Sequence, residues 1–227
     1  MLKKLLLDFK KIIFKKEFQV IIVSLLVFIL MHKFSYWEIS SNHYRLLERR
    51  FFQAIYFFVI PILFIVFRLK QNPLDFGLKG TSLKQSFRYL LLLILIMIPA
   101  VFFISHTKTF IRYYPQYRPI LTNFDLFLIY EAIMLFHLAG WEWIFRGFLL
   151  FGLKQKLGDQ TSIMIQTIPF VVFHITKPTV ELFGSIIAGV ILGIIAIRTH
   201  SIWPGVIAHW LVQLFLDMLI IQKKILY

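Results

Sequence analysis

The chain has 227 residues, of which 59% are hydrophobic and 16% are charged, whereas soluble globular domains carry about one-quarter charged residues. This composition argues against a soluble fold and excludes a disordered or collagen-like chain, and the lack of cysteine excludes a disulfide scaffold. The formal net charge is +14, but the basic residues lie between apolar runs, where they indicate membrane topology and lipid contacts. We therefore expect a multi-pass integral membrane protein that binds membrane lipids and no nucleic acid.

The N-terminus is predicted to form a basic amphipathic helix. Its first seventeen residues, MLKKLLLDFKKIIFKKE, repeat apolar side chains at helical spacing with lysines between them. Such a helix lies on an anionic lipid surface. No small-x-small cleavage site follows the next apolar stretch, 18–31, so we expect a retained first span rather than a signal peptide.

A series of apolar runs follows along the chain, and a membrane-spanning helix needs about 17 to 20 residues. The runs predict an all-α fold, a polytopic transmembrane helical bundle of seven to eight spans. The segment 124–153 is either one long helix broken near Gly140 or two separate elements. The runs lie at about 18–32, 51–67, 88–105, 124–139, 141–153, 160–175, 180–197 and 202–221.

One connecting loop, 106–123, is rich in basic and aromatic residues, among them Lys108, Arg112 and the pair Tyr113–Tyr114. We favour an aromatic belt at the level of the lipid headgroups. The alternative is a rim that contacts a substrate.

Ionisable side chains inside apolar helices are costly, and they usually mark a functional site or an ion or proton path. Eight such residues lie within or at the end of the apolar runs, with one neutral polar neighbour. They are Glu131, His137, Glu142, Arg146, His174, Glu181, His209 and Asp217, with Gln213 as the neutral neighbour.

The segment WEWIFRG places Glu142 and Arg146 four residues apart, so they share a helix face and can form an ion pair. The sequence leaves open whether that pair is purely structural. Glu131 precedes Glu142 by eleven residues, about 16 Å along a helix, which is too far for two carboxylates that share acid–base work. We expect Glu131 to be a packing or interface residue.

Two histidines lie in apolar runs further along the chain. His174 ends the run PFVVFH, four residues after Phe170, and a lone histidine in such a run is more often a core residue than a ligand. His209, Gln213 and Asp217 recur at intervals of four and line one stripe of the last apolar run. That stripe needs polar partners on neighbouring helices, or water.

Together these clusters offer a carboxylate, two imidazoles and an amide from three helices. Glu142, His174 and His209 could hold and deprotonate a water for attack on a peptide carbonyl, with or without a metal. Two histidines and one glutamate also form a recurrent ligand set for catalytic zinc, so a divalent metal such as zinc stays open. Arg146 or an imidazole could stabilise the oxyanion, and Gln213 could donate an amide N–H to it.

The order of these motifs resembles the CPBP intramembrane protease family, which includes type II CAAX prenyl endopeptidases and bacterial proteins linked to bacteriocin maturation and immunity. That family's pattern is Glu-Glu-x-x-x-Arg, then Phe-x-x-x-His, then His-x-x-x-Asn, each on its own membrane helix. The counterparts here are Trp141-Glu142-x-x-x-Arg146, Phe170-x-x-x-His174 and His209-x-x-x-Gln213.

The resemblance covers roughly residues 73–217 and implies an intramembrane endopeptidase, a hydrolase of a family labelled as metalloproteases. It predicts a protease core at 73–227, preceded by an N-terminal part, 1–72, with the amphipathic helix and two spans. The expected location is a bacterial inner or cell membrane. The expected partner is a peptide or protein substrate, with or without a lipid modification.

Two departures from the family pattern bear on activity. Trp141 stands where the family has its first glutamate, the water-activating base, and an indole cannot act as a base. Gln213 replaces asparagine and keeps the amide group. Either Glu142 takes over the base role with help from Arg146, or the protein is catalytically silent and acts as a membrane binding or immunity protein. A third interpretation, a small transporter or proton path, is less favoured because no internal repeat is evident.

Overall fold

A computed structural model of the protein describes residues 5, 9, 11–34, 44–80 and 82–226. All secondary structure within these residues is helical, which confirms the predicted all-α class. Eight of the seventeen residues of the predicted N-terminal amphipathic helix, 1–4, 6–8 and 10, lie outside the described residues. The elements are α2 (Lys16–Phe34), α3 (Arg45–Leu63), η1 (Phe64–Leu69), η2 (Pro73–Phe76), α4 (Leu83–Ile104), α5 (Lys108–Tyr113), η3 (Arg118–Leu121), α6 (Phe124–Glu142), η4 (Trp143–Leu149), α7 (Leu150–Val172), α8 (Thr179–Thr199) and α9 (Trp203–Leu226).

Within the described residues, five helical segments are long and apolar enough to cross a membrane. The predicted count of seven to eight spans is not confirmed. One reason is that three of the predicted runs merge into a single helical segment of 49 residues. The five segments are Arg45–Leu69, Leu83–Ile104, Phe124–Val172, Thr179–Thr199 and Trp203–Lys224.

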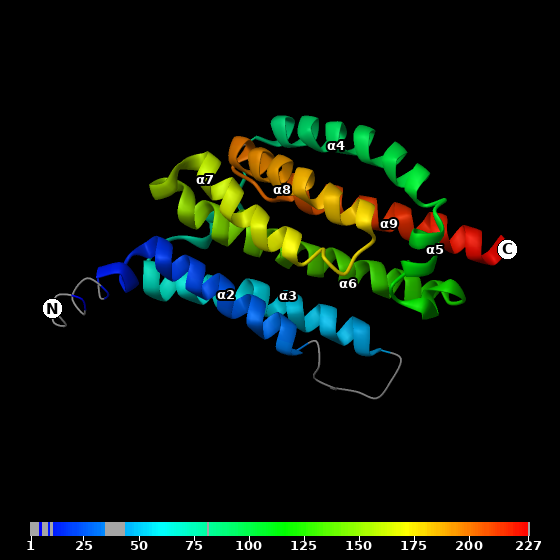
Figure 1. The fold of residues 1–227 in the computed structure, drawn as a ribbon, viewed down its shortest axis with the longest axis horizontal. Coiled ribbons are helices and arrows are strands. Elements are labelled where there is room, and N and C mark those ends of the chain that lie inside the picture. The colour runs from blue at the N-terminus through cyan, green and yellow to red at the C-terminus, as the bar shows by residue number, and fades with distance from the viewer. Residues whose placement is uncertain (1–4, 6–8, 10, 35–43, 81, 227) are drawn as a thin grey trace.

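The long segment changes direction at Gly158 and not near Gly140, as the sequence suggested. Gly158 has a φ of 77°, a left-handed conformation that glycine adopts without a steric cost. Figure 1 shows the chain turning back on itself within α7. Helix α6 instead continues through Gly140 into the π-helical segment η4.

Gly140 has a packing role instead. A Cβ atom there would lie 3.2 Å from the backbone of Ala54 and 3.1 Å from the Cβ of Phe57, both on α3. The missing side chain therefore allows α3 to pack closely along α6. This contact brings the N-terminal helices against the centre of the bundle.

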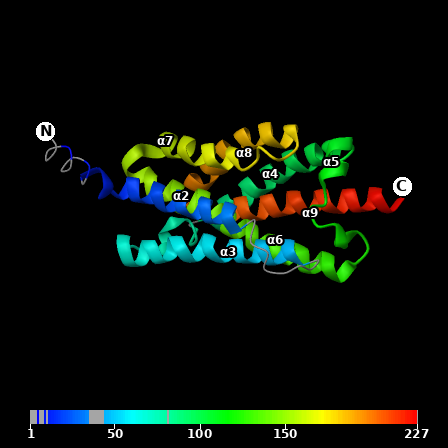
Figure 2. The same ribbon diagram turned by 60° about the horizontal axis from the view of Figure 1, so that its bottom comes forward.

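Helix α6 and η4 run through the middle of the molecule (Figures 1 and 2). Helices α2 and α3 lie on one side of them, and α4, α8 and α9 lie on the other. Residues 137–153 are buried without interruption, so this stretch is covered all round. A helix that is covered on every side is the core of its fold. Ionisable residues within this stretch are therefore held away from water and from lipid.

The close α3–α6 contact can be tested with alanine at Gly140. The new methyl group would press on the α3 backbone, and overpacking of this kind costs about 1–3 kcal/mol. We expect Gly140→Ala to lower the thermal unfolding midpoint of the detergent-solubilised protein. Gly184→Ala on α8 is the matched control, because nothing lies within 4 Å of a Cβ atom there. Equal midpoints for the two variants would contradict the packing role.

Candidate active site

The centre of the candidate site is the carboxylate of Glu142, the last residue of α6. Its Oε1 accepts hydrogen bonds from the guanidinium of Arg146 at 3.3 Å and from Nδ1 of His209 at 3.0 Å. The side chain of Glu142 is 0% exposed, whereas that of His209 is 25% exposed. The ion pair that the spacing of Glu142 and Arg146 predicts is therefore present and fully buried. The same carboxylate also contacts the imidazole of His209 on α9, a helix distant in sequence but adjacent in space.

The contact with Glu142 fixes which nitrogen of His209 carries the proton. An ionised carboxylate only accepts hydrogen bonds, so Nδ1 must be the donor. The lone pair of the neutral ring then resides on Nε2. The accessible part of this pair is thus the imidazole and not the carboxylate.

Gly205, one turn before His209 on α9, allows the two helices to approach. A Cβ atom at Gly205 would lie 3.1 Å from Oε2 of Glu142. Among the described residues, Oε2 has no hydrogen-bond partner. The sequence analysis missed Gly205, although its position four residues before His209 was a usable signal.

His174 lies just beyond the end of α7 and is 8% exposed. Its Nδ1 is 2.7 Å from the carbonyl oxygen of Phe170. A carbonyl oxygen only accepts, so Nδ1 carries the proton and Nε2 can accept. Burial lowers the pKa of His174 to about 4, so the ring is neutral near neutral pH.

The ring of Phe170 connects the predicted site residues. The guanidinium carbon of Arg146 lies 4.0 Å from its centroid, a cation–π contact. The ring centroids of His174 and His209 lie 4.6 Å and 6.4 Å from that of Phe170. Both histidines and the arginine therefore gather around one aromatic ring on α7.

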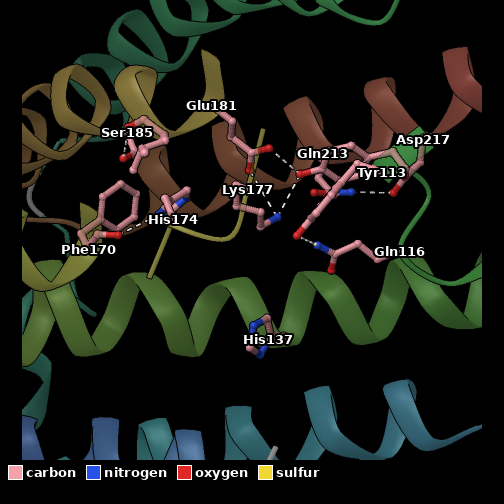
Figure 3. Close-up of polar contacts among 12 residues, drawn as sticks. Tyr113, Gln116, His137, Phe170, His174, Lys177, Glu181, Ser185, Gln213 and Asp217 are labelled. Carbon is pink, nitrogen blue, oxygen red and sulfur yellow. Dashed lines mark hydrogen bonds and ion pairs between the residues drawn. The ribbon is translucent and has the colours of Figure 1, made fainter. Parts of the chain in front are cut away.

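Gln213 points to a different partner. Its amide nitrogen donates to Oδ2 of Asp217 at 2.7 Å, as Figure 3 shows. Within the described part of the chain, no hydrogen bond joins Gln213 to Glu142, His174 or His209. The structure therefore brings four of the five predicted residues together around Phe170 and directs the fifth to Asp217.

Trp141 fills an aromatic pocket beside the site. Its ring centroid lies 5.0 Å from Phe145, 5.6 Å from Phe173 and 6.3 Å from His174. The indole Nε1 is buried with no hydrogen-bond partner among the described residues. This position is apolar and offers no acid–base group.

A metal ion at Glu142, His174 and His209 stays a prediction. No three histidine, aspartate or glutamate side chains in the described ranges lie close enough to hold one. Oε1 of Glu142 accepts from Arg146 and His209, and Nδ1 of His174 contacts a backbone carbonyl, which leaves Nε2 as the nitrogen of that ring available to a metal.

A second polar cluster, which we call the Tyr114 tie, consists of Tyr114, Lys177, Glu181 and Lys224, and Figure 3 labels Lys177 and Glu181. The hydroxyl of Tyr114 donates to Oε2 of Glu181 at 2.7 Å and accepts from Nζ of Lys177 at 2.9 Å. Lys177 and Glu181 also form an ion pair at 3.3 Å, and Lys224 donates to the carbonyl oxygen of Tyr114 at 2.9 Å. Burial raises the pKa of the Tyr114 hydroxyl well above its usual range, so it stays protonated. The tie joins the loop after His174 to α8 and α9.

The remaining polar residues lie elsewhere. Nε2 of His137 is 3.2 Å from the guanidinium of Arg50, on α3. Glu131 is 4% exposed, and the described residues give neither of its carboxylate oxygens a partner. Its backbone carbonyl accepts from the indole of Trp210 at 3.2 Å. None of these contacts reaches Glu142.

Comparison with known proteins supports the family resemblance. Residues 122–215 match the family model described as type II CAAX prenyl endopeptidase Rce1-like. The matched region contains Glu142, Arg146, His174, His209 and Gln213. No curated protein and no solved structure matches the chain. The family match and the five apolar helical segments point to an integral membrane protein that is similar, over residues 122–215, to type II CAAX prenyl endopeptidases.

The Tyr114 tie can be tested by removing one hydroxyl. Tyr114→Phe leaves the ring in place but removes two buried hydrogen bonds. We expect a loss of about 1–3 kcal/mol in the free energy of unfolding. Tyr44→Phe is the control, since Tyr44 is 50% exposed. Equal stability of both variants in denaturant titrations would contradict the role of the tie.

The buried, neutral state of His174 predicts a pH dependence of stability. Because its pKa falls from 6.5 to about 4 on folding, its contribution is fully present above pH 6.5 and is lost as the pH falls through about 4. His174→Asn does not titrate, so we expect it to lose less stability than wild type on acidification. Thermal unfolding above pH 6.5 and near pH 4 measures this difference. His106→Asn, a change at an exposed histidine, is the control. Equal acid sensitivity of His174→Asn and wild type would contradict the assignment.

Proposed function

We propose that the protein is an intramembrane endopeptidase in which His209 is the general base and Glu142 orients it. The observation that carries this proposal is the 3.0 Å contact between Nδ1 of the partly exposed His209 and Oε1 of the fully buried Glu142. A carboxylate with no exposed surface cannot meet water directly. An imidazole held by that carboxylate can.

The proposed reaction uses the free lone pair on Nε2 of His209. This nitrogen takes a proton from water while the water oxygen attacks the carbonyl carbon of the peptide. Glu142 stabilises the imidazolium that forms. The imidazolium then gives the proton to the leaving nitrogen as the C–N bond breaks, which releases a carboxylic acid and an amine.

The other residues take supporting roles in this proposal. Nε2 of His174 can accept a hydrogen bond, so it would hold the attacking water. Arg146 fixes Glu142 through the buried ion pair. Gln213 gives one amide hydrogen to Asp217 and keeps a second, which would donate to the oxyanion.

A second candidate is a catalytically silent membrane binding or immunity protein. The apolar pocket around Trp141 favours it, because the position of the family's first glutamate holds an indole with buried aromatic neighbours. Under this alternative the pair of Glu142 and His209 is only structural.

Cleavage in proteoliposomes separates the two candidates. The substrates are a prenylated fluorogenic peptide and the same peptide without the prenyl group. We expect cleavage by wild type, and a loss of about 10²–10⁴-fold in Glu142→Gln, His174→Ala and His209→Ala, the usual contribution of acid–base groups. His106→Ala is the matched control, because His106 also contacts the carbonyl four residues before it but is exposed.

Each outcome decides between the candidates. Normal cleavage by His209→Ala would refute the base assignment. Absence of cleavage by wild type, with unchanged peptide binding in all three variants, would support the silent protein.

A further inference from the structure

A cleft of about 450 Å³ lies where α5 meets the loop between α7 and α8. Three of its lining residues are basic: Lys108 and Arg112 of α5, and Lys177 of the loop. The remaining lining residues are hydroxyl-bearing side chains and one proline, and no acidic residue is among them. The cleft therefore presents positive charge and hydrogen-bond donors, the chemistry that binds an anion.

The net charge of the cleft comes from α5. Lys177 is paired with Glu181, which offsets its charge. Lys108 and Arg112 are exposed and lie four residues apart, so they share one face of α5. Two like charges on one helix face repel each other unless an anion lies between them.

A second cleft, of about 340 Å³, provides an internal comparison. It is lined by Lys154 and Asp75, and Lys16 donates to Gln71 and Gln155 on its wall. This cleft therefore includes an acidic residue, which the first cleft lacks.

An exposed apolar stripe begins at the edge of the positive cleft. Thr179 lines the cleft and is the first residue of α8. Along the same helix, Val180, Phe183 and Ile187 are 58%, 62% and 64% exposed. Figure 2 shows the start of α8 near α5. Positive charge at the end of an apolar stripe matches the shape of a lipid, with its headgroup above its acyl chains.

We propose that this cleft binds the phosphate headgroup of one anionic phospholipid, with its acyl chains along the exposed stripe of α8. Basic pockets between membrane helices bind such headgroups. Lys108 and Arg112 supply the charge, and the threonine hydroxyls donate hydrogen bonds to the phosphate oxygens. This lipid site is independent of proteolysis, so its test needs no substrate.

Native mass spectrometry of the full-length protein in detergent tests the site. The probes are phosphatidylglycerol and phosphatidylcholine with identical acyl chains. We expect wild type to retain phosphatidylglycerol in preference to phosphatidylcholine. The double variant Lys108→Gln/Arg112→Gln should bind phosphatidylglycerol about thirtyfold more weakly, the ratio that roughly 1 kcal/mol for each basic residue implies.

Two further variants keep the test decisive. Lys154→Gln, in the cleft that also contains Asp75, should leave the preference unchanged. Arg112→Lys keeps the charge and should keep the preference, which separates a charge effect from misfolding. An unchanged preference in the double variant, or its loss in Arg112→Lys, would overturn the proposal. Displacement of phosphatidylglycerol by inorganic phosphate would show a small-anion site and would overturn the lipid assignment.

Discussion

The dehydrated carboxylate of Glu142 is the constraint on which the rest of the structure depends. A buried charge is tolerated only with partners, and removing one partner of such a pair typically costs about 3–5 kcal/mol. Arg146 provides the first partner one helical turn away, and His209 provides the second from α9. The second contact requires α9 to lie against α6, and Gly205 permits that approach. The need to compensate the charge of Glu142 therefore fixes how closely α9 packs against α6.

Aromatic packing supplies the third helix of the site. Phe170 on α7 lies beneath the guanidinium of Arg146 and beside the ring of His174. The same neighbourhood encloses Trp141, whose indole keeps water away from the end of α6. With no carboxylate at position 141, the basic nitrogen closest to solvent is the imidazole of His209. The proposed function therefore assigns the proton transfer to His209 and not to position 141.

Local features of this site could be predicted from the sequence, and contacts between distant residues could not. The pairing of Glu142 with Arg146 follows from a spacing of four on a helix, and the structure shows it. The bond from Gln213 to Asp217 has the same spacing, but the amide was expected to face the site. The contact of Glu142 with His209 spans 67 residues, and only the packing of α9 on α6 creates it. A break near Gly140 was one of two alternatives for 124–153, because composition cannot distinguish a glycine that packs closely from one with a positive φ.

Lys177 connects the candidate site to the positive cleft. This lysine comes three residues after His174 and lines the positive cleft. It also donates to Tyr114 and forms an ion pair with Glu181. Tyr114 is held in turn by Lys224 near the end of α9, the helix that carries His209. The loop that positions one histidine and the helix that positions the other are therefore tied at the same tyrosine. Because Lys177 contacts both Tyr114 and Glu181, a displacement of the loop at Lys177 would break these contacts or move the Tyr114 tie with it.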